Sequence, residues 1–333
     1  MKKILVFGAT GLLGAYICLH FYKLGYKVIA VGRRESDNGF FADYNIPYYS
    51  VDITQKSNFE KLPTEGIDIV AHFAGDLPAS MKGYDGSKYI DSIVKGTYNV
   101  MDFVRDNNIG KVIFPQSLFD ISYLFGSKTP IPADSQRIAP LDGDHAMYVI
   151  CKNAAVDIIE HFHKMYAIKR FILRLSRVYA YHPNPYTYTD GEKVVISDRY
   201  LIKRAEKSLP IEIWGDPNRV LETCSMPDFL QIVEKCAESS SDGGIYNIGS
   251  GGSTLEERIR GIVDVFSPES NKSNITYAAN KRPAMQFLLD ISKTKSELGY
   301  TPTQKWIDFC RWFKEEQKAQ RFVKLWGSEE DYE

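Results

Sequence analysis

The sequence predicts an α/β protein in which a doubly wound parallel sheet is followed by a smaller C-terminal α/β lobe. Short apolar runs rich in β-branched residues alternate with segments that carry apolar residues at helical spacing, as in repeated strand–helix–strand units. The first such run is followed by a glycine-rich turn, which is typical of this fold class. The chain has 333 residues, of which 44% are hydrophobic, so it can bury one large core or two.

The glycine-rich turn joins the first strand to the first helix. Ile4–Phe7 is the apolar run, and Gly8, Gly11 and Gly14 follow it at three-residue spacing. The first glycine permits a tight turn, the second lets a pyrophosphate approach the backbone, and the third lets the helix pack close to the sheet. The helix N-terminus offers free N–H groups and roughly +0.5 of an elementary charge. We therefore predict a Rossmann dinucleotide site with contacts from Gly8, Thr10, Gly11, Leu12, Leu13 and Gly14.

The end of the second strand bears on which dinucleotide binds. Lys27–Val31 is followed by Gly32, Arg33 and Arg34, where a carboxylate that binds the adenosine ribose of NAD is usual. Arginine can bind a 2′-phosphate through two hydrogen bonds, whereas a carboxylate would repel it. We predict that NADP(H) is preferred, with Arg33 as the first candidate for this contact and Arg34 beside it. NAD(H) is the alternative, in which the two arginines are solvated loop residues.

The third strand is expected over Pro47–Val51 and ends at Asp52 and Ile53. We expect Asp52 to accept a hydrogen bond from the adenine amino group and Ile53 to lie against the ring. Asp52 also suits the cap of a following helix, which is the other interpretation.

The fourth and fifth strands end in residues that suit a ligand cleft. Ile67–Phe73 is followed by small residues that leave room for a cofactor, and Lys111–Phe114 runs into Ser117. The carboxyl ends of the strands in open α/β sheets bind ligands, so these residues are expected to face one cleft. The predicted cofactor contacts at the end of the fourth strand are Phe73, Ala74 and Gly75.

A tyrosine and a lysine four residues apart form the candidate catalytic pair. Tyr148 and Lys152 begin a predicted helix and share one face of it. The unperturbed pKa of tyrosine is about 10, and a nearby ammonium and a cationic nicotinamide are expected to lower it. Tyr148 would then exchange a proton with a sugar hydroxyl or carbonyl. Ser117 would hold that oxygen, and Lys152 would also bind the cofactor ribose.

Composition and charge argue against several other classes of protein. The net charge is −1 with no basic block, which gives no case for a nucleic-acid partner. No apolar stretch approaches the roughly 20 residues that span a bilayer, so no membrane partner is expected. The glycines within Met1–Ala15 favour a strand–turn–helix over a signal peptide. The five cysteines are scattered without metal-ligand spacing and fit reduced thiols in the cytoplasm, so no metal is expected.

Several motifs follow one another along nearly the whole chain. They are Gly8-x-x-Gly11-x-x-Gly14, His72-Phe73-Ala74-Gly75, Tyr89-Ile90-Asp91 with Gly96-Thr97, Tyr148-x-x-x-Lys152, Arg174 to Tyr179, Ile213 to Asp216, Tyr246 to Gly251 and Leu298 to Pro302. With them the chain resembles the NAD-dependent epimerase/dehydratase family, extended short-chain dehydrogenases/reductases that modify nucleotide sugars. The resemblance implies a Ser/Thr–Tyr–Lys catalytic set, a nicotinamide cofactor and most often a nucleotide-sugar substrate. It also implies a homodimer through a four-helix bundle formed by Tyr89–Asn107 and Tyr148–Tyr166 of each subunit.

The chain departs from the family pattern after the fifth strand. Counting from the strand end selects Ser117 as the catalytic hydroxyl, whereas counting back from Gly126 points nearer Ser122. We prefer Ser117 because the sheet fixes the geometry at a strand end. Leu118 and Phe119 stand where dehydratases of the family carry an Asp-Glu pair, which argues against 4,6-dehydration.

The substrate contacts and the domains follow from the same resemblance. Arg282 matches a family arginine that pairs with the nucleotide diphosphate, and Arg177 and Arg219 are further candidates, with exposed or structural arginines as the other interpretation. We expect a Rossmann domain over residues 1–177 with a return segment near 221–250. A substrate lobe is expected over 178–303, and a C-terminal helix and tail over 304–333, with a frayed acidic tail over Ser328–Glu333.

The predicted function is an NAD(P)-dependent nucleotide-sugar epimerase, in which hydride passes transiently to the nicotinamide while Tyr148 moves the proton. An NADPH-dependent 4-keto nucleotide-sugar reductase is an alternative that Arg33 and Arg34 favour. A carbonyl reductase for a non-sugar ketone is another. A non-catalytic NADP(H)-binding sensor is the alternative of a different class, although such proteins commonly lose the Tyr–Lys pair.

Overall fold

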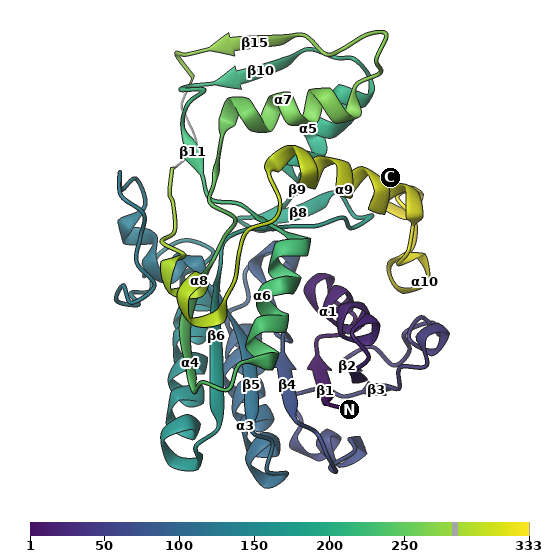
Figure 1. Ribbon diagram of the computed structural model, residues 1–333, viewed down its shortest axis with the longest axis vertical. Helices are drawn as coiled ribbons and strands as arrows, with labels where there is room; N and C mark the ends of the chain where they lie inside the picture. The colour runs from purple at the N-terminus through teal and green to yellow at the C-terminus, as the bar shows by residue number, and fades with distance from the viewer. Residues whose placement is uncertain (282–285, 333) are drawn as a thin grey trace.

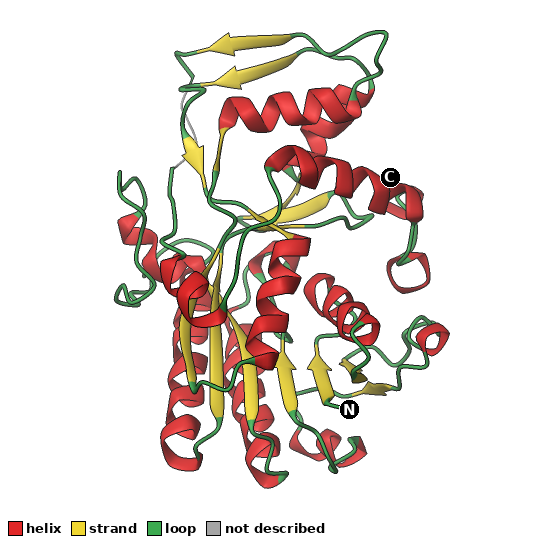
Figure 2. Ribbon diagram, viewed as in Figure 1, coloured by secondary structure: helices red, strands yellow, loops and turns green. Residues whose placement is uncertain are grey.

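A seven-stranded parallel sheet forms the centre of the computed structural model, which describes residues 1–281 and 286–332 (Figures 1 and 2). The strand order is β3-β2-β1-β4-β5-β6-β13, so the chain begins inside the sheet and winds outward in both directions. This is the doubly wound Rossmann arrangement that the sequence predicts. The strands are β1 (Lys3–Phe7), β2 (Lys27–Gly32), β3 (Tyr48–Ser50), β4 (Ile69–His72), β5 (Lys111–Ser117), β6 (Lys169–Leu175) and β13 (Gly243–Ile248).

Helices cover both faces of the sheet, which explains why the middle residues of its longer strands are mostly apolar. In β1, Ile4 and Val6 belong to the core under α1 and α6, whereas Leu5 and Phe7 belong to the core under α3 and α4. Side chains of a strand alternate between faces, so one apolar run supplies both cores. These four helices are α1 (Leu12–Lys23), α3 (Gly96–Asp106), α4 (Ala146–Tyr166) and α6 (Met226–Glu238).

A late part of the chain returns to this lobe. Helix α6 packs against α1, and β13 pairs in parallel with β6, from Gly243 opposite Arg170 to Ile248 opposite Leu175. The chain therefore crosses between the lobes more than once, near the carboxyl ends of β6 and β13. The domain boundaries at 177 and 303 stay predictions.

The smaller lobe lies beyond the carboxyl ends of the sheet (Figure 1). Its core includes Ile213, Ile259 and Phe309, contributed by three different elements. Thr254 and Glu257 form a capping box that fixes the start of α7. The lobe is built from α5 (Ser197–Glu206), β10 (Ile211–Trp214), α7 (Leu255–Phe266), β15 (Ile275–Ala278) and α9 (Trp306–Ala319).

Short strands and turns join the two lobes. They are β7 (Val178–Tyr179) paired with β12 (Cys224–Ser225), the β8 (Tyr186–Thr189) and β9 (Glu192–Val195) hairpin, and β11 (Val220–Leu221) paired with β14 (Ser253–Thr254). The remaining elements are η1 (Ala42–Tyr44), η2 (Lys56–Lys61), η3 (Pro78–Ser80), α2 (Gly86–Tyr89), η4 (Ile90–Lys95), η5 (Leu118–Leu124), α8 (Ser292–Leu298), α10 (Val323–Trp326) and η6 (Glu330–Tyr332). Every helix in the described ranges is too short or too polar to span a lipid bilayer.

The predicted fraying of the C-terminal tail is wrong for residues 328–332. The Ser328 backbone N–H donates to the Asp331 carboxylate at 2.7 Å, and the Tyr332 hydroxyl donates to the Trp326 carbonyl oxygen at 2.7 Å. Glu329 accepts from Arg199 of the smaller lobe at 2.7 Å. Two local hydrogen bonds and one contact with Arg199, 130 positions away, order the tail, and its acidic composition alone does not reveal them.

Candidate functional site

The glycine turn between β1 and α1 has a backbone suited to a phosphate. Gly8 has a φ of +82°, and a Cβ on it would lie 2.6 Å from the Phe73 carbonyl oxygen. A Cβ on Gly14 would lie 2.2 Å from the Gly8 carbonyl oxygen, so only glycine allows α1 to pack this closely. Gly11 is exposed and is the N-cap of α1, so no side chain caps the first turn. The N–H groups of that turn fit the pyrophosphate of a dinucleotide.

The two arginines after β2 have different partners. The Arg33 side chain is 69% exposed, and its guanidinium lies 3.6 Å from the Asp76 carboxylate beyond β4. Arg34 donates to the Leu325 carbonyl oxygen at 2.7 Å. Arg33 is therefore the more available of the two for a cofactor phosphate, and the part predicted for Arg34 stays a prediction.

The predicted adenine contacts take part in local structure. Asp52 accepts from the Thr54 backbone N–H at 3.0 Å in a local turn, and Gln55 is the N-cap of η2, so the alternative that Asp52 caps the following helix is wrong. Ile53 is buried, and a Cβ on Gly96 would lie 2.6 Å from its Cδ1 atom, so Ile53 packs closely on the start of α3. Both residues lie just beyond β3, and their contact with a cofactor stays a prediction. The same holds for Phe73, Ala74 and Gly75 beyond β4.

The segment Phe322–Tyr332, which we call the strap, contacts the glycine turn. Trp326 Nε1 donates to the Thr10 carbonyl oxygen at 2.9 Å, and its ring stacks on His182 with centroids 4.5 Å apart. The sequence analysis missed this segment. Its only signal was Phe322 and Trp326 at helical spacing, and the rings stack in the structure at 4.3 Å. The strap connects the predicted cofactor loop to the end of the chain.

Tyr148 and Lys152 lie on the first turns of α4, beside β5. Tyr148 is 9% exposed, and its hydroxyl makes no hydrogen bond to any described residue. Its ring meets the ring of Tyr89 edge-on, with centroids 5.7 Å apart. Lys152 Nζ donates to the Pro115 carbonyl oxygen at 2.8 Å and lies 5.9 Å from the centroid of the Tyr148 ring. The structure therefore brings the predicted pair together at the end of β5.

Burial opposes a charge on either member of this pair. It raises the pKa of Tyr148 well above the usual value, with a further rise from Tyr89, and it lowers the pKa of Lys152 to about 7. The expected lowering of the Tyr148 pKa is thus wrong for the protein alone. Lys152 does not offset the desolvation of the phenol.

Ser117 is the last residue of β5, and Ser122 lies within η5. The Ser117 hydroxyl oxygen accepts from the Phe119 backbone N–H at 3.2 Å and caps η5. A serine hydroxyl that accepts one hydrogen bond still has its own hydrogen to donate. Ser117 is two residues from Pro115, which binds Lys152, and the choice of Ser117 over Ser122 stays a prediction.

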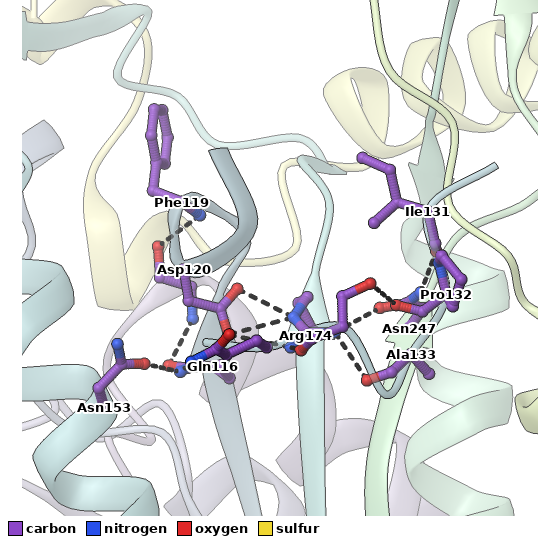
Figure 3. Close-up of polar contacts among 12 residues, drawn as sticks. Gln116, Phe119, Asp120, Ile131, Pro132, Ala133, Asn153, Arg174 and Asn247 are labelled. Carbon is purple, nitrogen blue, oxygen red and sulfur yellow. Dashed lines mark hydrogen bonds and ion pairs between the residues drawn. The ribbon is translucent and has the colours of Figure 1, made fainter. Parts of the chain in front are cut away.

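A second buried polar cluster lies close by and joins β5, β6 and β13 (Figure 3). Arg174 and Asp120 are fully buried, and Arg174 Nε donates to the Asp120 carboxylate at 2.9 Å. Arg174 Nη1 donates to the Ala133 carbonyl oxygen at 2.9 Å and to Asn247 Oδ1 at 3.1 Å. Gln116 Nε2 extends the cluster to Asp120, at 3.2 Å. Asp120 is thus committed to Arg174, and the prediction against 4,6-dehydration stays a prediction.

Arginines gather where the smaller lobe faces the sheet. Arg177 lies 3.4 Å from Asp198, and Arg258 pairs with the same carboxylate at 3.1 Å. The Arg258 Nε atom is buried and has no hydrogen-bond partner among the described residues. Burial and the nearby Arg258 lower the pKa of Arg219. The sequence analysis missed Arg258, and Arg282 lies outside the described residues.

Comparison with known proteins identifies a family for this chain. The model of the NAD dependent epimerase/dehydratase family matches residues 4–249. The putative UDP-glucose 4-epimerase of Methanocaldococcus jannaschii is 26% identical over 306 residues, which cover 90% of this chain and 93% of that protein. The UDP-glucose 4-epimerase of Neisseria meningitidis serogroup B is 25% identical over 349 residues, with 94% and 97% covered.

Two solved structures share the fold over almost the full length. The UDP-glucose 4-epimerase from Thermotoga maritima with UDP-glucose gives a TM-score of 0.75 at 18% identity and covers 96% of this chain and 99% of its own. The UDP-glucuronic acid 4-epimerase from Bacillus cereus in complex with UDP-glucuronic acid and NAD gives 0.68 at 20% identity, with 94% and 98% covered. The family match extends over well more than half of the sequence. This chain therefore belongs to the NAD dependent epimerase/dehydratase family.

Proposed function

We propose that this protein is a nucleotide-sugar epimerase. The observation that carries the proposal is the Tyr148 hydroxyl, which belongs to a buried side chain and has no hydrogen-bond partner among the described residues. That hydroxyl oxygen is not among the fully buried atoms without a partner, so it reaches the surface of the site, where a ligand atom can hydrogen-bond to it. Family membership and the glycine turn support a sugar bound beside a nicotinamide as that ligand.

Each member of the catalytic set has one role in this proposal. Tyr148 takes a proton from a sugar hydroxyl and later returns it. Ser117 donates a hydrogen bond to the same sugar oxygen, and Lys152 binds the cofactor ribose. When bound, the nicotinamide supplies a hydride acceptor and donor. Because burial raises the pKa of Tyr148, its deprotonation depends on positive charge that arrives with the cofactor.

The direct test is conversion of UDP-glucose to UDP-galactose, followed by chromatography, with the near-ultraviolet absorbance of the nicotinamide recorded in parallel. We expect conversion with no net change in that absorbance. Tyr148→Phe is expected to lower kcat by about 10³-fold, within the usual range for a general acid–base, while cofactor affinity stays unchanged. Unchanged turnover in this variant would contradict the proposal.

A 4-keto nucleotide-sugar reductase is the second candidate, and Arg33 favours it. We propose that NADP(H) is preferred over NAD(H), because β2 ends in Gly32 and the Arg33 side chain is mostly exposed. Fluorescence titration with both cofactors tests this preference. The Arg33→Ala variant is expected to bind NADP about tenfold more weakly. Arg311→Ala, on the exposed face of α9, is the control. Tighter binding of NAD than of NADP to the unaltered protein would contradict the preference for NADP(H). Net oxidation of NADPH on addition of a 4-keto nucleotide sugar would favour the reductase.

We also propose a homodimer through η4, α3 and α4. Helix α3 packs on α4, and large apolar side chains on these elements are exposed, among them Ile90, Tyr98 and Ile150. Such side chains suit a helix-bundle interface. Light scattering is expected to show a dimer for the unaltered protein and a monomer for the Tyr98→Glu/Ile150→Glu variant. Leu209→Glu, at an exposed site of the smaller lobe, should remain dimeric.

A further inference from the structure

A cavity of about 350 Å³ lies where the two lobes meet, next to Tyr148. Its walls come from the loop around η3, the residues just before α4, and the tip of the β8–β9 hairpin. Met81, Tyr84 and Tyr89 line one part of it, and Asp144 and Asp190 line another. Sites for small molecules begin at about 300 Å³, so the cavity can hold a sugar ring.

The hairpin is fixed to the larger lobe by backbone contacts. The Gly83 N–H donates to the Gly191 carbonyl oxygen at 3.3 Å, and a Cβ on Gly191 would lie 2.8 Å from the Gly83 Cα atom. The Asp190 N–H donates to the Asp144 carboxylate at 3.0 Å. The tip of the β8–β9 hairpin is therefore held against Gly83 and against Asp144, just before α4.

Two contacts connect the cavity to the catalytic tyrosine. Tyr89 lines the cavity, and its ring meets the Tyr148 ring edge-on. On the other side, Asp144 hydrogen-bonds to His145, whose ring lies edge-on to Tyr148 with centroids 6.4 Å apart. A ligand in the cavity would thus lie beside the group that moves the proton.

The charged side chains among the described residues that line the cavity, Asp144 and Asp190, are both acidic. Tyr89 is 1% exposed, and its hydroxyl makes no hydrogen bond to any described residue. Burial and the Asp144 carboxylate raise the pKa of Tyr89 to about 12, so the hydroxyl stays protonated. Burial acts to raise the pKa of Asp144, but the Asp190 N–H and His145 lower it, so Asp144 stays ionised. Among the described residues that line the cavity, none is basic.

We propose that this cavity selects the sugar and that it admits an uncharged hexose and rejects a uronate. The inference rests on the proposed function and extends it to the substrate class. Sugar hydroxyls can donate to Asp144 and Asp190. They can also hydrogen-bond to the Tyr89 hydroxyl, which has no partner among the described residues. A uronate would place a third carboxylate beside the half-buried Asp144 and the exposed Asp190, and no described residue that lines the cavity is a cation. The known relatives include epimerases of UDP-glucose and of UDP-glucuronate, so family membership leaves this choice open.

The test compares the binding of UDP-glucose and UDP-glucuronate by calorimetry in the Tyr148→Phe background, where no turnover interferes. We expect UDP-glucose to bind at least tenfold more tightly. The Asp144→Asn/Asp190→Asn variant should bring the two affinities within about threefold, because it removes both charges and keeps similar shapes. Asparagine also tolerates the φ of +51° at position 190. Asp142→Asn, an exposed residue of the same loop outside the cavity, should leave the ratio unchanged.

A second variant separates sugar binding from folding. Tyr89→Phe is expected to weaken UDP-glucose about tenfold and to leave the affinity for UDP alone unchanged. Three results would overturn the proposed selectivity of the cavity. They are equal affinities for UDP-glucose and UDP-glucuronate, no binding of either, or a ratio of the two affinities that the double variant leaves unchanged. Selective binding by a protein that converts no nucleotide sugar would instead overturn the proposed function and leave this inference standing.

Discussion

The larger lobe contains two buried polar regions, and they differ in whether their hydrogen bonds are complete. Around Arg174, every guanidinium nitrogen donates, to the Asp120 carboxylate, to Asn247 or to a carbonyl oxygen (Figure 3). Around Tyr148, its own hydroxyl and that of Tyr89 have no partner among the described residues. The side chains of both regions are buried, but the two tyrosine hydroxyl oxygens are not among the fully buried atoms without a partner. A complete set of partners indicates a structural role for Arg174, whereas a hydroxyl that has no protein partner and keeps access to the site can hydrogen-bond to a ligand.

The largest expected effect is on the region around Arg174, where the hydrogen bonds are complete. Arg174→Met leaves the fully buried Asp120 carboxylate without its cation, and we expect the free energy of unfolding to fall by about 3–5 kcal/mol. Urea denaturation measures this loss. Arg311→Met, which removes an exposed arginine, should change stability by no more than about 0.5 kcal/mol. A loss below about 1 kcal/mol for Arg174→Met would mean that the cluster does not support the fold.

The next effect concerns the region around Tyr148. It distinguishes Ser117 from Ser122 as the catalytic hydroxyl. Ser117→Ala removes the hydroxyl at the end of β5, and we expect kcat to fall by about 10²-fold, as for loss of one donor to a reacting oxygen. Ser122→Ala should change kcat by less than about threefold, since Ser122 lies within η5. Thermal denaturation of both variants checks that neither has unfolded. The reverse order of kinetic effects would assign the hydroxyl to Ser122.

A smaller effect depends on pH and comes from Lys152. Burial lowers its pKa to about 7, whereas in the unfolded chain it is about 10.4. Below pH 7 the ammonium is charged in both states, so the cost of burying it is fully present, and the cost disappears as the pH rises. Relative to Lys152→Met, the free energy of unfolding of the unaltered protein should therefore increase between pH 7 and 9. The increase is at most about 1.4 kcal/mol per pH unit, measured by urea denaturation. A difference that stays constant with pH would show that Lys152 keeps its proton.

The smallest effect concerns the strap. Trp326→Phe removes the hydrogen bond to the Thr10 carbonyl and keeps most of the ring packing, which corresponds to about 0.5–1.5 kcal/mol. We expect dinucleotide affinity to fall by about threefold to tenfold, because the strap holds the glycine turn in place. Fluorescence titration measures the affinity, and Trp214→Phe, at an exposed site of the smaller lobe, is the control. Tighter binding would instead mean that the strap competes with the cofactor.

The sequence by itself determined the features that depend on neighbouring residues. The strand, turn and helix around Gly8 and Gly14 follow from local spacing and from the absence of a Cβ, and the alternation of apolar residues gives the two faces of the sheet. The pairing of Tyr148 with Lys152 also follows from spacing along one helix. The family motifs extended this local information to the whole fold.

Only the tertiary structure decided the properties that depend on distant partners. Trp326 and Thr10 are 316 positions apart, and neither local pattern predicts their hydrogen bond or the ordering of the tail. The Tyr148 pKa is raised because low-polarity surroundings from several elements outweigh the nearby lysine, a balance that sequence spacing does not contain. Asp120 is likewise structural because Arg174, 54 positions away, neutralises it. Burial and electrostatics sum over the whole fold, which is why they could not be predicted residue by residue.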